Sequence, residues 1–532
     1  KLLLSVLLML GVGFALIANQ SPQYIHLSWQ HDPTITMTIM WRTGPDVTDS
    51  VVEYGRTAQY GSVAIGTTEP YFIRTPGHVL SKEQVIQLLT STPYSSSSQV
   101  RFPFYAFGTS EKLYALVLVS KEGNLLLWPD GRLETLVGHK LVDKDGDGTP
   151  DILDGNPRLG LKDVAAHYAQ LQSLKVPWEK GWLCLVTLRE FGYFIPQYRY
   201  DPKKDVLINQ QTGKVYYPKN GRFVAQDGEA LSPGWAYEKA MWHVVELTGL
   251  EPNTVYHYRC GAEGKWSSDY YFRTAPKYSS NTVVKIAVFG DSRGGWNALA
   301  ECFQAAKKEG AQLIVFTGDL TNEATQPEYD GFFSASRGVL EYIPFMPVHG
   351  NHERELITYF GEFALPGNEK YFSFDFGPIH FTYLYSYTEA DVAQQCPWLL
   401  KDLSITSLPW KIVVAHKTIY SSGTHGITPY LMQYWVPIFD KTGVDFYING
   451  HDHIYERSWP IKEGKIDPNG TVYITTGGAG APLYPVKHGD WWTAVAESAH
   501  HYIILLARSD EIEMTVKRLD GSVLDSVCFK KP

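Results

Sequence analysis

Five apolar segments in the second half of the chain each end directly before a residue that can bind a metal. They are rich in Val, Ile and Phe, a composition typical of the buried strands of an α/β sheet. Ligands of such sheets bind at the carboxyl ends of the strands, so these residues are expected on one rim. The five ends are Gly290-Asp291, Gly318-Asp319, Gly350-Asn351-His352-Glu353, His416 and Gly450-His451-Asp452-His453. The chain is therefore expected to form an α/β sheet that gathers carboxylate, amide and imidazole groups.

Each of these strand ends carries little information when it is taken alone. An aspartate after a strand is usually a helix cap or a turn residue. The segment Gly450-His451-Asp452-His453 equally fits two polar loop residues, although residues i and i+2 of an extended backbone point to the same side. Imidazole is also the commonest side-chain ligand of Zn, Fe, Mn and Ni. The five ends in this order therefore indicate a metal centre.

The length and the charge of the chain limit what it can be. At 532 residues it is too long for a single core, and about two to four domains are expected. The formal net charge of −9 argues against a protein that holds nucleic acid through the phosphate backbone. We therefore expect a multidomain globular protein without nucleic-acid binding by bulk charge. The sequence predicts no oligomeric state.

Residues 1–18 have the features of a secretory signal peptide. They begin with Lys1, continue with a short apolar run and reach small residues near Ala18. The alternative is an uncleaved membrane anchor, because the run is near the lower length limit for a span. No later stretch is long and apolar enough to cross a bilayer, so we expect a secreted or cell-surface protein. The five cysteines are scattered and odd in number, and no disulfide is predicted.

Segments with the alternation of antiparallel strands lie on both sides of a long interruption. They occupy residues 23–67 and 238–275. The run Leu250-Glu251-Pro252-Asn253-Thr254 has the form of a corner between two strands of a sandwich. The two parts resemble one fibronectin type III-like module. Residues 68–237 are expected to be an α+β domain inserted into a loop of that module.

The predicted insertion contains an acidic loop at residues 143–154. Carboxylates at alternate positions, with a glycine that lets the chain turn, can converge on one Ca²⁺. The loop resembles the calcium repeats of thrombospondin type 3 and dockerin modules, and the alternative is a solvated acidic turn. Its carboxylates are Asp143, Asp145, Asp147, Asp151 and Asp154. A calcium ion here would make the insertion more rigid and would take no part in catalysis.

Taken together, the strand-end motifs resemble the calcineurin-like metallophosphoesterase superfamily. The preceding sandwich makes the chain similar to the purple acid phosphatase branch of that superfamily. The resemblance implies an α/β fold, a four-layer α/β/β/α metallophosphoesterase sandwich over residues 283–530. It also implies an all-β fibronectin III-like sandwich before it, which here carries the large insertion. The insertion itself lies outside the resemblance.

The resemblance also implies a centre of two metals bridged by the carboxylate of Asp319. Mixed oxygen and nitrogen ligands without thiolates suit Fe, Mn or Zn. An anionic bridge limits the repulsion between two cations about 3.5–4 Å apart. In this set Asp291 and His453 complete the first metal, and Asn351, His416 and His451 hold the second.

The expected activity is hydrolysis of a small phosphate monoester, as in an acid phosphatase. The metal pair lowers the pKa of a bound water, and the resulting hydroxide attacks phosphorus. His352, which adjoins Asn351, and His425 are the candidates to protonate the leaving group. One alternative is a phosphodiesterase or nucleotidase with the same centre. Another is a cell-surface binding protein whose metal site has decayed.

Three positions depart from the family pattern. Asn322 occupies the position of the tyrosine ligand of the purple members, and Arg293 stands where other metallophosphoesterases have the histidine of Asp-x-His. The first metal is therefore labile, or Asn322 or water completes it. Arg293 fits a phosphate clamp and equally fits a structural arginine. Gly426 replaces a second histidine that plant relatives carry next to the position of His425.

Overall fold

A computed structural model of the protein describes most of the chain outside the predicted insertion and parts of the insertion itself. The described parts are residues 21–44, 47–76, 81–82, 198–209, 213–231, 235–262, 264–353 and 357–531, with separate strands between residues 104 and 188. The predicted signal peptide, residues 1–18, lies outside them. So do the candidate calcium ligands Asp143, Asp145, Asp147, Asp151 and Asp154. Within the described residues, no helix is long and apolar enough to cross a membrane.

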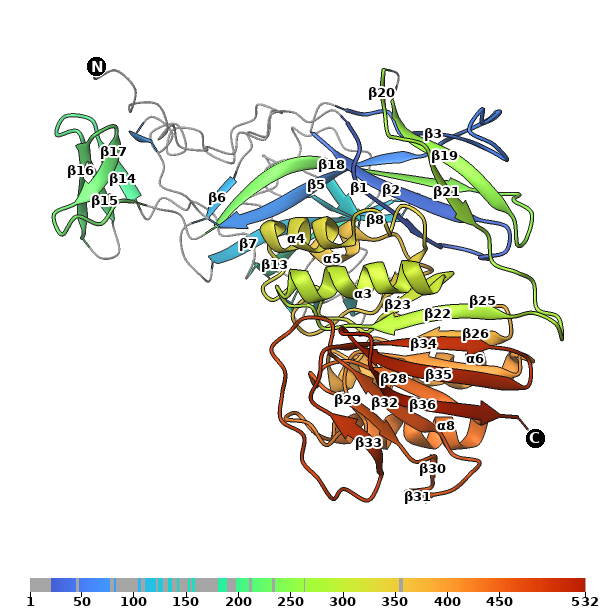
Figure 1. Ribbon diagram of the computed structural model, residues 1–532. Helices are drawn as coiled ribbons and strands as arrows, with labels where there is room; N and C mark the ends of the chain where they lie inside the picture. The colour runs from blue at the N-terminus through green and yellow to red at the C-terminus, as the bar shows by residue number, and fades with distance from the viewer. Residues whose placement is uncertain are drawn as a thin grey trace, which may run out of the picture.

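Two antiparallel sheets form the β-sandwich that precedes the catalytic part. The first has the order β1 (Gln23–Ser28), β2 (Met37–Thr43), β18 (Trp235–Leu247) and β5 (Thr67–Pro76), with β6 (Phe104–Ala106) also on β18. The second has the order β20 (Lys265–Trp266), β19 (Val255–Ala262), β3 (Val51–Gly55) and β4 (Ser62–Ile65), with β21 (Tyr270–Arg273) also on β19. Figure 1 shows β18 and β19 crossing this region beside strands from the N-terminal segment.

Alternation of apolar residues explains how the two sheets of the sandwich pack on a common core. Along β19 every second residue from Tyr256 is buried, as expected for a strand with one face on a core. Trp29, Trp41 and Trp242 are fully buried in the same core. The β5–β18 pairing continues to Pro76 and Trp235, past the expected edges at residues 67 and 238.

The described strands between the two halves of the sandwich form three further small sheets. Figure 1 draws the meander of β14 to β17 apart from the main body. These sheets are β10 (Leu141–Val142), β11 (Ile152–Leu153) and β12 (Asn156–Pro157); β13 (Lys180–Leu188), β7 (Glu111–Ser120), β8 (Gly123–Leu127) and β9 (Leu133–Thr135); and β14 (Tyr198–Asp201), β15 (Val206–Asn209), β16 (Val215–Lys219) and β17 (Arg222–Ala225).

Two mixed sheets form the middle of the catalytic part. Sheet A has the order β24 (Phe345–Pro347), β23 (Leu313–Phe316), β22 (Val284–Phe289), β34 (His501–Ala507), β35 (Glu511–Arg518) and β36 (Val523–Lys530). Sheet B has the order β25 (Phe372–Phe376), β26 (Ile379–Tyr383), β27 (Trp410–Val414), β28 (Phe446–Asn449), β32 (Val472–Thr476), β29 (Tyr455–Ser458) and β33 (Thr493–Glu497). A short hairpin of β30 (Ile461–Lys462) and β31 (Lys465–Ile466) stands beside sheet B.

The two sheets pack face to face, with helices on their outer faces. The ring of Phe446 on β28 meets that of Phe529 on β36 at 4.8 Å between centroids. Tyr455 on β29 donates a hydrogen bond of 2.6 Å to Asp525 on β36. The helices are α3 (Trp296–Glu309), α4 (Gln326–Ser336) and α5 (Ile357–Glu362) on the side of sheet A, and α6 (Glu389–Ile405) and α8 (Val436–Thr442) on the side of sheet B. Helix α7 (Pro429–Tyr434) packs against α6 and α8. The result is the expected four-layer α/β/β/α fold, preceded by a β-sandwich.

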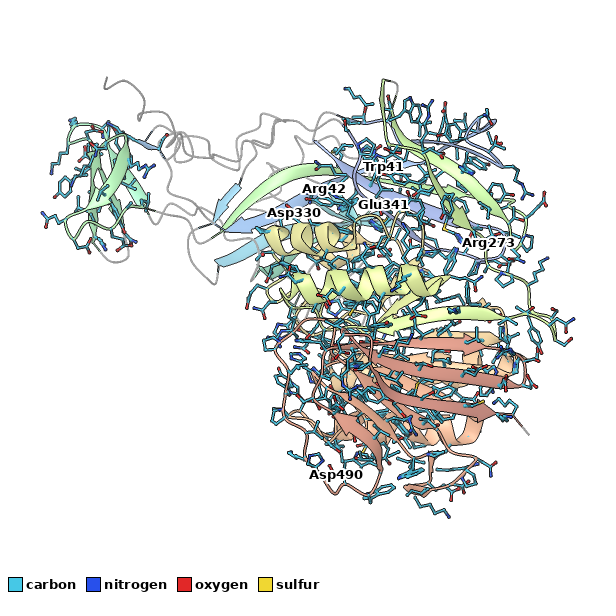
Figure 2. The ribbon with its side chains drawn as sticks, in the orientation of Figure 1. Trp41, Arg42, Arg273, Asp330, Glu341 and Asp490 are labelled. Carbon is cyan, nitrogen blue, oxygen red and sulfur yellow. The ribbon has the colours of Figure 1, made fainter. Side chains whose placement is uncertain are left out.

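The β-sandwich is joined to the catalytic part through the face that carries α4. The buried guanidinium of Arg42 on β2 donates a hydrogen bond of 2.9 Å to Asp330 on α4. Figure 2 labels both residues. The hydroxyl of Tyr258 donates to the carbonyl of Glu341 at 2.8 Å. Helix α4 follows the loop that contains Asn322. The contact between Arg42 and Asp330 therefore holds the helix at one edge of the candidate site in place.

Candidate metal centre

The strand ends meet at one place between the two sheets. Sheet A supplies Asp291 after β22, Asp319 after β23 and Asn351 after β24. Sheet B supplies His416 after β27, and His451 and His453 after β28. Asp291, Asp319 and His451 have positive φ angles of 61°, 54° and 70°. Non-glycine residues in this conformation are uncommon and often mark functional sites.

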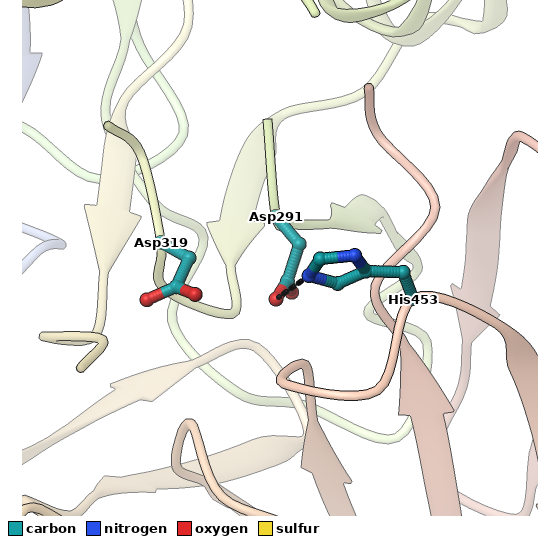
Figure 3. Close-up of side chains that lie close together, drawn as sticks. All are labelled: Asp291, Asp319 and His453. Atoms are coloured by element: carbon teal, nitrogen blue, oxygen red, sulfur yellow. Dashed lines mark ion pairs between the residues drawn. The ribbon is translucent and has the colours of Figure 1, made fainter. Parts of the chain in front are cut away.

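Asp291, Asp319 and His453 form the first cluster. Each offers one ligand atom, and these atoms all lie within 4.8 Å of one another. Figure 3 shows the imidazole of His453 beside the carboxylate of Asp291, where Nε2 lies 3.6 Å from Oδ1. Asp291 Oδ2 is buried and accepts no hydrogen bond from any described residue. A buried carboxylate oxygen without a donor fits a metal ligand.

Asp319, Asn351, His416 and His451 form the second cluster. His416 Nε2 lies 3.0 Å from Asn351 Oδ1 and 3.2 Å from Asp319 Oδ1. The rings of His416 and His451 lie 5.0 Å apart between centroids. Asp319 thus reaches both clusters, which is the position required of a bridging carboxylate.

Backbone carbonyls fix which imidazole nitrogen is free in two of the histidines. His416 Nδ1 lies 2.8 Å from the carbonyl of Thr317, and His453 Nδ1 lies 2.7 Å from that of Pro482. A carbonyl can only accept, so each Nδ1 carries the proton and each neutral ring keeps a lone pair on Nε2. Both free nitrogens face the carboxylates, which is how metal-binding histidines are usually oriented.

The electrostatics of the two clusters favour a bound cation. Burial raises the pKa of Asp291 well above its ordinary value, and the neighbouring charge of Asp319 raises it further. Burial works in the same direction on Asp319, but the charge and hydrogen bond of His416 lower the pKa of Asp319 below its ordinary value. Burial alone would lower the pKa of His416, yet Asp319 and Asp291 raise it to about 9. Two buried carboxylates that demand this much positive charge, with only oxygen and nitrogen donors, fit Fe, Mn or Zn.

Glu353 holds the loops that carry the candidate ligands of sheet A. Its Oε2 accepts hydrogen bonds from the backbone N–H groups of Asp319 at 2.9 Å and Gly350 at 2.8 Å. Its Oε1 accepts from the N–H of Thr321 at 3.1 Å. Burial, with the nearby charge of Asp319, raises the pKa of Glu353 to about 7. The sequence places Glu353 in a motif but gives no sign of this role.

Two glycines are required because side chains approach them closely. A Cβ at Gly350 would lie 2.2 Å from Asp319 Oδ1. A Cβ at Gly450 would lie 2.0 Å from Asp291 Oδ2. Any other residue at either position would displace a carboxylate of the first cluster.

Both histidines expected to protonate the leaving group lie at the centre. His352 Nδ1 donates to the carbonyl of Asn322 at 2.7 Å, and its Nε2 lies 3.9 Å from Asp319 Oδ2. His425 stands on an exposed loop with its ring stacked on that of His451 at 4.0 Å between centroids. Asp452 holds that loop by accepting the N–H of His425 at 2.8 Å.

Arg293 and Asn322 are bound to each other at the edge of the first cluster. Asn322 Oδ1 accepts hydrogen bonds from Arg293 Nε at 3.1 Å and Nη2 at 2.9 Å. The side-chain oxygen with which Asn322 would bind a metal is thus occupied by the guanidinium of Arg293. The role of Asn322 as a metal ligand stays a prediction. Tyr484, which the sequence did not single out, stacks on His453 at 4.0 Å between centroids and places its hydroxyl 3.4 Å from Arg293 Nη1.

Comparisons with known proteins agree with this geometry. Residues 284–455 match the calcineurin-like phosphoesterase family, and residues 195–274 match the purple acid phosphatase N-terminal domain, a match that begins within the predicted insertion. Purple acid phosphatase 21 of Arabidopsis thaliana is 31% identical over 348 residues, which cover 61% of this chain and 73% of that protein. The chain belongs to the purple acid phosphatase family. Members of this family are metal-dependent phosphoesterases, so the expected enzyme class is confirmed.

Two further relatives define the extent of the similarity. Purple acid phosphatase 15 of Arabidopsis thaliana is 32% identical over 48% of this chain, and the matched region spans only 56% of that relative. The structure of purple acid phosphatase PPD1 from yellow lupin seeds superposes with a TM-score of 0.59 at 16% identity, over 97% of this chain and 75% of that one. At this identity the superposition supports the shared fold of sandwich and metallophosphoesterase domain.

Proposed function

We propose that this purple acid phosphatase relative is an exported enzyme with two metals that hydrolyses phosphate monoesters. The observation that supports it most is the convergence of buried acceptor atoms from two sheets. Asp291 Oδ2 accepts no hydrogen bond from the described residues, and His416 Nε2 faces Asn351 Oδ1 at 3.0 Å. Without a metal, the two buried carboxylates raise the pKa of His416 to about 9, so that a proton on Nε2 supplies part of the positive charge they require. Cations bound between these groups would supply that charge in its place.

The two clusters support the proposed ligand roles. Asp319 would bridge the metals, Asp291 and His453 would hold the first, and Asn351, His416 and His451 would hold the second. When bound, two such cations would lower the pKa of a water nucleophile and offset charge on the phosphoryl oxygens. Fe, Mn and Zn all fit these oxygen and nitrogen ligands.

His352 is the proposed general acid. The carbonyl of Asn322 accepts its Nδ1 proton and turns Nε2 toward the clusters. A second proton on Nε2 would reach the leaving oxygen as its bond to phosphorus breaks. His425, stacked on His451, would contact the phosphate from the other side.

The remaining assignments are part of the same proposal. Residues 1–18 would direct export and leave a secreted or cell-surface protein. Residues 23–67 and 238–275 would form one domain, 68–237 its insertion and 283–530 the catalytic domain. A calcium ion on the 143–154 loop would stabilise the insertion.

Comparing ester classes tests the activity. Chelator-treated protein, reloaded with Zn²⁺, Mn²⁺ or iron, should turn over para-nitrophenyl phosphate about tenfold more efficiently than bis-para-nitrophenyl phosphate. A preference for the diester would indicate a phosphodiesterase or nucleotidase. Metal binding without turnover of either ester would refute the enzyme and leave a binding protein.

A series of leaving groups tests the role of His352. His352→Gln should lower kcat by about 10²–10⁴ for alkyl phosphates, whose leaving oxygen needs a proton, and much less for nitrophenyl phosphate. His488→Gln, at an exposed position, is the matched control and should change neither rate. Equal losses for both substrate classes would show that His352 acts in another way.

A further inference from the structure

The guanidinium of Arg293 lies directly against the ligand atom of the first cluster. Arg293 Nη1 is 3.5 Å from His453 Nε2, the nitrogen that keeps the lone pair. No comparable cation faces the corresponding atom of the second cluster among the described contacts, where His416 Nε2 meets Asn351 and Asp319 oxygens. The two clusters therefore differ in a permanent positive charge.

Arg293 is held in this place rather than free to leave it. Asn322 Oδ1 accepts from Nε and Nη2, and the hydroxyl of Tyr484 lies 3.4 Å from Nη1. The backbone of Arg293 has a φ of 38°, an unfavourable conformation for a residue with a side chain. Its N–H donates to the carbonyl of Asp319 at 3.4 Å. A solvent-facing arginine would need none of these constraints.

From this arrangement, and resting on the proposed function, we infer that Arg293 is a built-in cation that replaces part of the first metal. Its charge would repel a cation bound to Asp291 and His453, so the first metal would bind more weakly than the second. The same charge, with N–H groups directed into the site, would hold a phosphoryl oxygen. The working enzyme would then hold one metal tightly, through Asp319, Asn351, His416 and His451.

Metal titration tests the first consequence. Titrating Zn²⁺ into chelator-treated protein should show one tight equivalent, bound at the second cluster. A second equivalent, bound by Asp291 and His453 of the first cluster, should bind at least about tenfold more weakly. Arg293→Gln should tighten the second equivalent about tenfold or more and leave the first unchanged. Arg293→Lys, which keeps the charge, should leave the second equivalent weak, and Arg273→Gln on the sandwich is the matched control. Two tight equivalents in the native chain would overturn the inference.

Phosphate binding tests the second consequence. With one equivalent of Zn²⁺ bound, Arg293→Gln should bind inorganic phosphate about tenfold or more weakly. A merely structural arginine would weaken metal and phosphate binding together, whereas here the two change in opposite directions. Tighter or unchanged phosphate binding would overturn the inference. If Arg293→Gln does not fold, Asn322→Ala, which releases the guanidinium, should also tighten the second equivalent, and an unchanged second equivalent would overturn the inference.

These outcomes separate the two proposals. One tight and one weak metal without turnover of any phosphate ester would refute the proposed function and leave the role of Arg293 intact. Two tight metals with full turnover would refute the role of Arg293 and leave the function intact.

Discussion

The two sheets of the catalytic part contribute different chemistry to one site. Sheet A supplies the oxygen groups proposed as ligands, Asp291, Asp319 and Asn351, whereas sheet B supplies the proposed nitrogen ligands, His416, His451 and His453. Neither sheet alone has a donor set for two metals of the Fe, Mn or Zn type. The site therefore depends on the packing of one sheet against the other.

Each sheet also positions the ligands of its partner. His416 of sheet B donates its Nδ1 proton to the carbonyl of Thr317, which follows β23 of sheet A. Asp291 of sheet A accepts the backbone N–H of His451, which follows β28 of sheet B, at 2.9 Å. Misalignment of the sheets would thus disturb ligand orientation as well as distance. Substitutions in each sheet can test whether both sets of groups are needed to hold the metals.

The largest effect is expected from Asp319, the one ligand that belongs to both clusters. Asp319→Ala should lower kcat/KM by about 10³-fold or more and reduce the content of both metals, because the charge between them is lost. Metal content per chain and monoester turnover are the measurements. Asp520→Ala, at an exposed turn, is the control and should retain both. Retention of native turnover by Asp319→Ala would contradict the two-metal centre.

The nitrogen ligands should differ among themselves. His416→Ala removes the lone pair next to Asn351 and Asp319, and should lose the tightly held metal with a fall in kcat of about 10²-fold or more. His453→Ala should lose only the weakly held metal, with a fall of about tenfold to 10²-fold. Elemental analysis after dialysis distinguishes the two, with His31→Ala on the sandwich as control. Loss of the same metal in both variants would mean that the clusters are not separate.

The convergence of the candidate ligands was predictable because their positions after the strands are encoded locally. A buried parallel strand followed by glycine and a polar residue specifies where that residue lies, whatever the rest of the chain does. The apolar residues Leu299, Cys302, Phe303 and Ala306 at helical spacing are likewise the buried face of α3. The α/β fold class and the family followed from the same motifs.

Contacts between distant loops were not predictable. The pairing of Arg293 with Asn322 depends on how two strand ends approach each other, which spacing does not encode. Tyr484 lies in a loop without a pattern, and Glu353 resembles any charged residue after a motif. These side chains acquire their roles only from tertiary packing, which single-sequence periodicity does not describe.

Glu353 tests how sheet A holds its ligands. Glu353→Gln places an amide N–H group against backbone donors, so the metal-free protein should lose about 1–3 kcal/mol of unfolding free energy. Urea denaturation in chelator measures this. Glu341→Gln is the matched control, because burial also raises the pKa of Glu341 but its Oε2 has no donor among the described residues, so a smaller loss is expected. Equal losses in the two variants would show that burial alone, rather than the backbone hydrogen bonds, sets the effect.

The smallest expected effect compares one buried histidine from each sheet. His380 on β26 of sheet B lies between carboxylates, with Nδ1 2.7 Å from Asp375 and Nε2 3.1 Å from Asp402. Burial alone would lower its pKa, but the two carboxylates raise the pKa of His380 to about 9. His501 on β34 of sheet A instead hydrogen-bonds with the hydroxyl of Thr476 and the carbonyl of Ala499, and burial lowers its pKa to about 4. One histidine is therefore charged and the other neutral over the same pH range.

The two should give opposite pH dependences of stability. The folded pKa of His380 exceeds its unfolded value, so its contribution is complete below about pH 6.5 and is lost as the pH rises through about 9. We expect about 1–2 kcal/mol, because the largely exposed Asp375 is screened by solvent. Urea denaturation at pH 5.5 and pH 9.5 should show that His380→Gln costs more at the lower pH. His501→Gln should cost less at the lower pH, because His501 gains a proton in the unfolded chain below about pH 6.5 but stays neutral in the folded protein. An equal cost of His380→Gln at both pH values would mean that its carboxylate partners do not hold a charged imidazole, and that sheet B carries no such pH-dependent support.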